Sequence, residues 1–156
     1  MAYDDRETGL TVEDRGSKLG LPQNQDAEAN VLAAMLLSPE VVEEAQVELQ
    51  PDDFYRPIHK TIYTAMVDMY NSRIPIDSIS LIDYLRSINK LDAVGGPYEL
   101  LRISSKVSSS AHLEYHALIL RQLHTRRIMR TGFQQLLAFS ADESMDIDDI
   151  LVEAHR

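Results

Sequence analysis

Cysteine and tryptophan are absent from the 156-residue sequence, which also holds just six glycines and six prolines. The lack of cysteine excludes disulfide bonds and thiolate metal sites, and it is compatible with the cytoplasmic location that we expect. No apolar run approaches the ~18 residues of a membrane span, and the first 20 residues are polar rather than signal-like. We therefore expect no membrane partner.

Strand patterns are also lacking. No stretch alternates apolar and polar residues as a half-buried strand does, whereas apolar residues recur at helical spacing along most of the chain. The sequence therefore predicts an all-α protein. We expect a disordered tail over residues 1–20, which have no hydrophobic period, then a compact multi-helix globular head over 21–109 and an antiparallel helical hairpin over 110–156.

Basic residues are outnumbered, 15 against 25 acidic residues, and the net charge is −10. The segment 101–141 is the exception, with six basic residues and one acidic residue, and 142–156 reverses this with six acidic and one basic. Proteins that grip duplex DNA usually present a basic face and a positive net charge. We therefore expect DNA to bind weakly or indirectly.

Capping residues and prolines predict the helix boundaries. Asn24 or Gln25 is expected to cap a first helix, and Pro39 to open a second in the first turn, where its missing N–H costs nothing. Asp52 or Asp53 is expected to cap the third helix. Later boundaries are an N-cap at Asp77 or Ser78 and a long helix from Ala111 to about Phe139, followed by an acidic break and a short return helix.

Apolar residues at helical spacing predict the buried faces. In the third helix the row is Ile58, Ile62, Ala65, Met66 and Met69. In the next helix the row is Leu81, Leu85 and Ile88. The long helix is richer still, with Leu113, Ala117, Leu120, Leu123, Ile128, Met129, Phe133, Leu136 and Leu137. One short return helix cannot cover so much apolar surface, which predicts self-association through the hairpin.

The segment "LDAVGGPYEL" raises the question of a phosphate-binding loop. Such a loop needs glycines that lead into a helix with a lysine and a hydroxyl residue, as in GxxxxGK[ST]. Neither is present here, and Glu99 stands where an anion would bind. We interpret Gly95 and Gly96 as a tight turn with positive φ, after which Pro97 opens another helix.

Three further groups of polar residues resemble sites but lack the required spacing. His112 and His116 lie one helical turn apart, as metal ligands can, but Glu114 is about 200° away from His112 around the helix. The acidic residues 142–149 have no glycine and closing glutamate in the register of a calcium loop. The serines within residues 104–110 lack the histidine and aspartate partners that a serine nucleophile requires. We therefore expect no metal, no cofactor and no catalytic residue.

The basic segment has two interpretations. Its members are Arg121, His124, Arg126, Arg127 and Arg130. The last three lie on one side of a helix and could bind phosphate. The favoured alternative is a protein-contacting hairpin, in which the acidic return helix lies beside the arginines and neutralises them.

The assembled pattern resembles the N-terminal domain of bacterial replicative DNA helicases, the DnaB family. The segments that carry the resemblance are "LPQNQDAEANVLAAMLL", "DDFYRPIHKTIYTAMVDMY", "IPIDSISLIDYL", "LDAVGGPYELLRI" and "YHALILRQLHTRRIM". They cover residues 21 to about 140 in the order and spacing of that family.

The resemblance implies a non-catalytic collar of paired subunits on a hexameric ring, on which the C-terminal helicase-binding domain of primase docks during DNA replication. The ATPase motor of that family lies beyond this domain, after a linker. Because no GxxxxGK[ST] segment occurs in the sequence, we expect neither ATP hydrolysis nor DNA unwinding, and ATP and Mg²⁺ would belong to the motor.

For primase contact we predict five residues on the outer half of the long helix: Arg126, Arg130, Phe133, Gln134 and Leu137. Phe133 or Leu137 would be the anchor, and the arginines would orient the partner. The competing interpretation places Phe133 and Leu137 in the core of the hairpin. Alternative functions are a generic helical adaptor, a weak single-strand-binding module or a helical hydrolase, the last of which needs a constellation of titratable groups that the sequence does not show.

Overall fold

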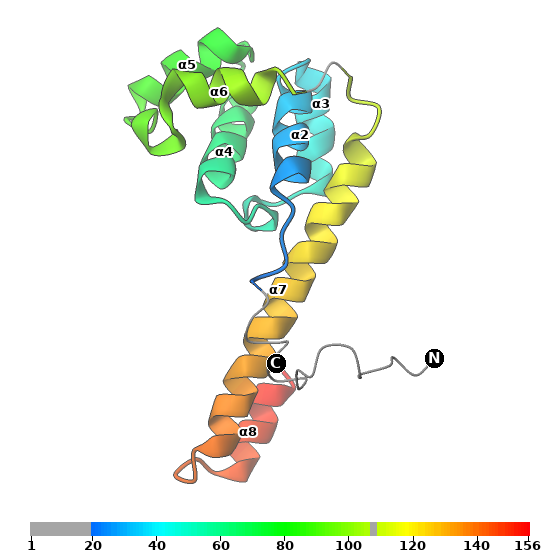
Figure 1. The fold of residues 1–156 in the computed structure, drawn as a ribbon, viewed down its shortest axis with the longest axis vertical. Coiled ribbons are helices and arrows are strands. Elements are labelled where there is room, and N and C mark those ends of the chain that lie inside the picture. The colour runs from blue at the N-terminus through cyan, green and yellow to red at the C-terminus, as the bar shows by residue number, and fades with distance from the viewer. Residues whose placement is uncertain (1–19, 107–108) are drawn as a thin grey trace, which may run out of the picture.

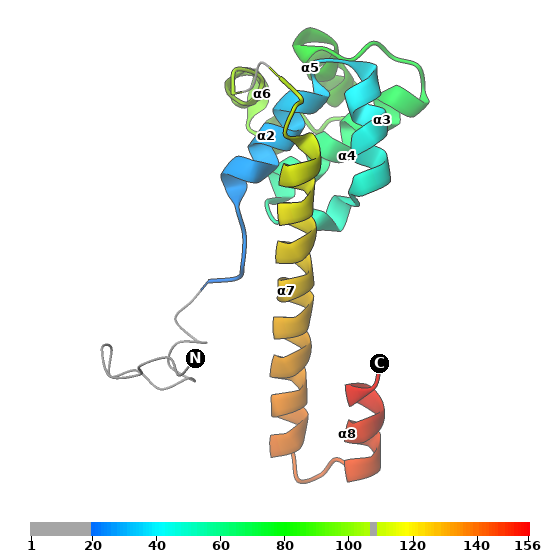
Figure 2. The ribbon, with the colours of Figure 1, turned by 90° about the vertical axis from the view of Figure 1, so that its right-hand side faces the viewer.

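The computed structural model describes residues 20–106 and 109–156, and every regular element in these ranges is helical (Figures 1 and 2). This confirms the all-α prediction. The predicted disordered tail lies outside the described residues, apart from Gly20. The elements are α2 (Gln25–Met35), α3 (Pro39–Glu48), the 3-10 turn η1 (Pro51–Asp53), α4 (Pro57–Asn71), α5 (Ser78–Ser87), the 3-10 turn η2 (Asp92–Val94), α6 (Gly96–Ser104), α7 (Leu113–Ala141) and α8 (Ile147–Ala154).

Helix α2 is the centre of the head. Val31, Leu32 and Met35 are buried together with all four of its alanines, and the helix contacts α3, α4, α6 and α7. Small side chains let these neighbours approach closely, and a helix that is apolar on almost all sides belongs in a core. The Asn24 side chain accepts a hydrogen bond from the Ala27 N–H at 2.9 Å, which confirms it as the cap.

Helix α4 buries the predicted row, with Ile58 partly covered, but the prediction of its cap was wrong. Asp53 closes the turn η1, and α4 begins four residues later at Pro57. Proline fixes its own φ in the helical range and holds the preceding residue extended, and Arg56 has ψ 127°. The chain therefore enters α4 without a side-chain cap.

Helix α5 begins as predicted, because the Asp77 carboxylate accepts from the Ser80 N–H at 2.8 Å. Leu81 and Leu85 are buried, but Ile88 is 37% exposed, so its predicted burial was wrong. The helix ends at Ser87, and Ile88 already belongs to the turn in which Asn89 adopts a φ of 57°. Ile88 therefore does not continue the buried row of Leu81 and Leu85.

The two glycines form the predicted corner. Gly95 has φ 96° and Gly96 has φ 75°, and Pro97 lies in the first turn of α6. A side chain on Gly95 would also come within 3.0 Å of the Glu99 Cβ. Positive φ and close approach both require glycine at this position.

Helix α7 has 29 residues and is about 43 Å long. Its beginning packs into the head, where Leu113, Ala117 and Leu120 join the core. The rest projects away from the head, and α8 folds back beside its far end in the antiparallel sense (Figures 1 and 2). Because α7 serves both regions, the division at residue 109/110 stays a prediction. In the described part of the chain, no helix combines the length and apolar content that crossing a membrane requires.

Candidate partner-binding site

An ion pair and a histidine–carboxylate hydrogen bond fasten the middle of α7 to the head. Arg121 Nη1 lies 2.8 Å from Glu48 Oε2 at the end of α3, and His124 Nδ1 lies 2.7 Å from Asp53 Oδ1 in η1. The second carboxylate oxygen of Asp53 accepts from the Gln50 N–H at 2.7 Å. The buried Asp53 therefore joins η1 to α7 instead of capping α4.

The next arginines of α7 hold the segment that precedes α2. Arg127 Nη1 donates to the Pro22 carbonyl at 2.9 Å, and Arg130 Nη1 donates to the Gly20 carbonyl at 2.9 Å. Residues 20–22, which we call the strap, thus follow α7 away from the head (Figure 1). The guanidinium of Arg127 also lies over the Tyr55 ring, 5.5 Å from its centroid.

These contacts correct the prediction that the acidic return helix neutralises the basic segment. Arg121, His124 and Arg127 take their partners from the head and the strap. The prediction that Arg126, Arg127 and Arg130 lie on one side of the helix is also corrected. Arg127 faces η1 and the strap, whereas Arg126 is exposed. The head reaches this part of α7, whereas α8 lies beside its far end.

The predicted partner residues, which we call the partner face, begin beside this anchor with Arg126 and Arg130, the latter of which also holds the strap, and extend beyond it to Phe133, Gln134 and Leu137. At 100° per residue, Arg126, Arg130, Phe133 and Leu137 fall within about 60° of one another around α7, and Gln134 lies about 40° further. Phe133 is 58% exposed and Leu137 is 69% exposed. Neither is therefore core of the hairpin in the single chain.

The seam of the hairpin consists of other residues. Leu136 and Phe139 of α7 and Ile150 of α8 are partly covered. Helix α8, all of which the structure describes, has no buried residue, and Ile147, Leu151 and Val152 are more than half exposed. The hairpin thus leaves apolar side chains of both helices open to solvent.

The acidic residues at the tip of the hairpin act as turn and cap residues. Asp142 accepts from the Ser144 N–H and hydroxyl at 3.0 and 2.6 Å, and these hydrogen bonds lower the pKa of Asp142. Asp146 accepts from the Asp148 N–H at 2.8 Å and caps α8. Within the described ranges, no group of three or more histidine and acidic side chains is placed to hold a metal ion.

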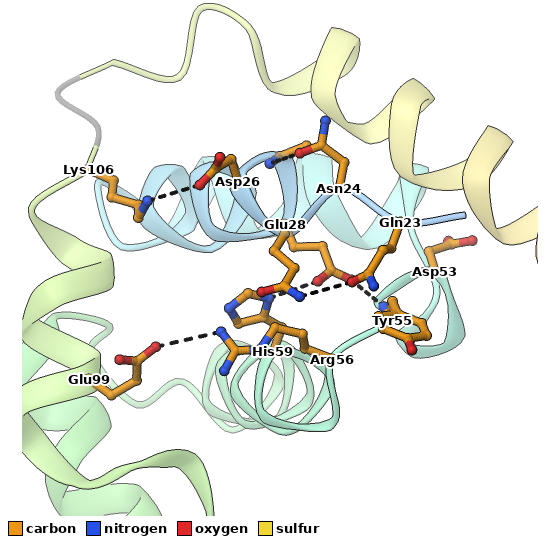
Figure 3. Close-up of polar contacts among 12 residues, drawn as sticks. Gln23, Asn24, Asp26, Glu28, Asp53, Tyr55, Arg56, His59, Glu99 and Lys106 are labelled. Atoms are coloured by element: carbon orange, nitrogen blue, oxygen red, sulfur yellow. Dashed lines mark hydrogen bonds and ion pairs between the residues drawn. The ribbon is translucent and has the colours of Figure 1, made fainter. Parts of the chain in front are cut away.

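A buried acid–histidine pair lies inside the head (Figure 3). His59 Nδ1 of α4 is 2.9 Å from Glu28 Oε2 of α2, and both side chains are about 1% exposed. The other Glu28 oxygen accepts from the Tyr55 N–H. His59 Nε2 has no hydrogen-bond partner among the described residues. The pair joins α2 to α4 and is out of reach of a substrate. The one sequence signal for it was an acidic residue amid the alanines of α2.

Two pKa shifts report on packing in the head. The Tyr63 hydroxyl donates to the Leu49 carbonyl at 2.8 Å, and burial raises the pKa of Tyr63 to about 12. Arg102 donates to both carboxylate oxygens of Glu99 at 2.8 and 2.6 Å, and it lowers the pKa of Glu99. Both groups stabilise the head without forming a reactive centre.

Comparison with known proteins identifies the family that shares this architecture. Residues 20–122 match the model of the DnaB-like helicase N terminal domain. The replicative DNA helicase DnaC of Bacillus subtilis is 34% identical over 136 residues, which is 86% of this chain and 30% of the relative. The replicative DNA helicase DnaB of Rhodothermus marinus is 30% identical, over 85% of this chain and 14% of the relative. The chain thus spans less than a third of the length of these relatives.

Two solved structures share the fold. One is the N-terminal domain of DnaB helicase from Mycobacterium tuberculosis, with a TM-score of 0.81, 28% identity, and coverage of 87% of this chain and 96% of that one. The other, described as a DnaB-like replicative helicase and its interactions with primase, has a TM-score of 0.67, 25% identity, and coverage of 85% and 31%. The head and hairpin therefore have the fold of a helicase N-terminal domain. The chain belongs to the family of DnaB-like helicase N-terminal domains.

Proposed function

We propose that this chain is a non-catalytic collar domain that pairs with copies of itself in the hexameric ring of a replicative DNA helicase and docks primase. The observation that carries the proposal is the exposed apolar surface of the hairpin, on Phe133 and Leu137 of α7 and on Leu151 and Val152 of α8. Surfaces of this kind on soluble proteins mark sites of protein association. A solved relative whose description names its interactions with primase supports the choice of partner.

Self-pairing is expected to use both helices of the hairpin, because each exposes apolar side chains that the other does not cover. Sedimentation at tens of micromolar should therefore show a dimer or a ring of dimers. The double variant Leu151→Ala, Val152→Ala should shift the population toward monomer. A parent chain that sediments as a monomer throughout this range would contradict self-pairing.

Primase is expected to contact the partner face. Phe133 and Leu137 would serve as anchors that cost ~2 kcal/mol or more of binding free energy on truncation, whereas Arg126 and Arg130 at the rim would act mainly on the association rate. Because Phe133 and Leu137 are exposed, their replacement should leave the core of the head intact.

Calorimetry with the C-terminal helicase-binding domain of primase tests this placement. Phe133→Ala, Leu137→Ala should weaken binding at least about 30-fold, which corresponds to ~2 kcal/mol. The matched pair Leu151→Ala, Val152→Ala should weaken it far less. Equal affinity of the parent and a folded Phe133→Ala, Leu137→Ala variant would exclude the partner face as the docking site. A parent that neither pairs nor binds primase would favour a generic adaptor.

The chain is expected to be inert toward ATP, because its sequence has no phosphate loop. Purified protein should show no ATP turnover above a control preparation from the same host. Binding to a single-stranded oligonucleotide should be weak, and strong binding with a steep salt dependence would point instead to a nucleic-acid-binding module.

A further inference from the structure

A cavity of about 290 Å³ lies between α2 and the start of α7. This part of the fold is at the opposite end of α7 from the hairpin (Figures 1 and 2). Its polar lining consists of Asn30 from α2, Lys106 and Ser109 from the α6–α7 connection, His112 directly before α7, and His116 from α7. The two histidines that the sequence pattern singled out therefore share a cavity with a lysine.

The charges around this cavity favour an anion. No carboxylate is among the described residues that line it, although the protein has a net charge of −10. Asp26 of α2 approaches the Lys106 ammonium at 3.3 Å, but its side chain is 89% exposed, so solvent screens this pair (Figure 3). Glu114, the nearest acid on α7, lies about 200° from His112 around the helix.

The neutral lining residues complete a set of hydrogen-bond donors. The Ser109 hydroxyl oxygen accepts from the Ala111 N–H at 3.1 Å, which leaves its own hydrogen free to donate. Asn30 offers the two N–H bonds of its side-chain amide. Lys106 donates only, and both imidazoles donate when they are protonated.

A divalent metal fits this cavity less well than an anion. The rings of His112 and His116 have centroids 6.3 Å apart, but no third histidine or acidic ligand is placed with them in the described part of the chain. The Lys106 ammonium would also repel a bound cation. We propose that the cavity binds an anion of the phosphate class, held by Lys106, His112 and His116 and by hydrogen bonds from Asn30 and Ser109.

The volume limits the size of this ligand. Pockets that enclose drug-sized molecules measure ~300–1,000 Å³, so this cavity, at about 290 Å³, is at the lower edge of that range and has ample room for one phosphate group. The group could belong to a small phosphate monoester or to the phosphodiester backbone of a single strand. Because the cavity is far from the partner face, the site is independent of the function proposed above, and the failure of one leaves the other standing.

Nuclear magnetic resonance of the histidine rings in the full chain provides the test, with inorganic sulfate as the probe. We expect saturable shifts of the His112 and His116 rings as sulfate is added at constant pH and ionic strength. His155 on α8 serves as the internal reference.

Matched variants separate the site from general electrostatics. Lys106→Gln and His116→Gln should each weaken sulfate binding about tenfold, because each replaces a side chain that would donate a hydrogen bond to the anion. Lys90→Gln and His155→Gln remove the same side chains from exposed positions elsewhere and should have no effect. Circular dichroism confirms that each variant is folded.

Competition identifies the source of the phosphate. Displacement of sulfate by a nucleoside monophosphate, or by a single-stranded oligonucleotide without terminal phosphates, would support the proposal and assign it to a monoester or to a phosphodiester. Sulfate that neither compound displaces would be an adventitious ion only and would overturn it. Equal shifts of His155 and of the two cavity histidines, or a response to zinc but not to sulfate, would overturn it as well.

Discussion

The two ends of α7 differ in burial although they belong to one continuous helix. Near the head, Leu113, Ala117 and Leu120 are buried against α2 and its neighbours. Near the tip, Phe133 and Leu137 are equally apolar and are more than half exposed. Helical periodicity is present at both ends, so the difference lies in the elements that are available to cover each face.

The same contrast holds for the elements that pack against α7. The head surrounds α7 with α2, α3 and η1, whereas the hairpin offers α8, which buries none of its residues. Regions with few buried apolar contacts open locally at a lower free energy than the core does. The hairpin should therefore unfold locally in the isolated chain and become stable when a second copy or another partner covers it.

The sharpest comparison between the regions is a leucine-to-alanine pair. Leu81 is 0% exposed in the head, and Leu137 is 69% exposed in the hairpin. Leu81→Ala should lower the free energy of unfolding by ~2–5 kcal/mol, because it leaves a cavity. Leu137→Ala should change it by less than ~0.5 kcal/mol. Urea denaturation at a concentration low enough to keep the chain monomeric measures both, and equal losses would remove the distinction.

The alkaline limit of stability should be set in the head by Tyr63. Its pKa is raised from 10.0 to about 12 in the folded chain, so its contribution is fully present below pH 10 and is lost as the pH rises toward 12. A shift of this size corresponds to roughly 2–3 kcal/mol. Between pH 10 and pH 12, the free energy of unfolding of the parent should therefore fall by roughly 2–3 kcal/mol more than that of Tyr63→Phe. Parallel curves for the two proteins would show that burial of this hydroxyl does not control the transition.

Substitution of an arginine that holds the strap tests the border between the head and the hairpin. Arg127→Gln removes hydrogen bonds to the carbonyls of Pro22 and Asp53 and should cost ~1–2 kcal/mol. The neighbouring Arg126→Gln changes an exposed residue and should stay within ~0.5 kcal/mol. If both variants behave alike, the strap contributes nothing to stability.

Local sequence signals predicted those parts of the fold that depend on nearby residues. Asn24 and Asp77 act as caps within three residues of themselves, and Gly95 adopts the positive φ that its own turn requires. Asp53 shows the limit of such signals. It resembled a cap for α4, but its carboxylate pairs with His124, 71 residues further along the chain.

For the candidate site, the sequence could predict which residues share one side of α7, but not whether that side is exposed. Helical spacing placed Phe133 and Leu137 on one side of α7, but it could not tell an exposed face from the core of the hairpin. That outcome depends on where α8 lies, and Leu136 and Phe139 occupy the seam instead. The hydrogen-bond partners of Arg127 are backbone carbonyls, which carry no sequence signal. Glu28 escaped notice because α2 is buried on almost all sides, so its helical period does not mark a polar face.

The smallest predicted effect compares two aspartate caps, Asp77 on α5 and Asp146 on α8. Each carboxylate accepts a backbone hydrogen bond at 2.8 Å, and Asp77 accepts a second hydrogen bond from the Ser80 hydroxyl at 3.2 Å. In the head, Asp77→Ala should lower the free energy of global unfolding by ~1 kcal/mol, because α5 unfolds together with the core. In the hairpin, Asp146→Ala should leave the global value unchanged, because α8 opens before the head does.

Hydrogen exchange distinguishes these outcomes. With Asp146→Ala, the amides of α8 should exchange about fivefold faster or more, which corresponds to ~1 kcal/mol of local opening, while amides of α2 and α4 keep the parent rates. Asp77→Ala should instead accelerate exchange of the slowest amides of the head. A loss of global stability with Asp146→Ala as large as that with Asp77→Ala would mean that head and hairpin unfold as one unit. The contrast between the two ends of α7 would then be one of exposure alone.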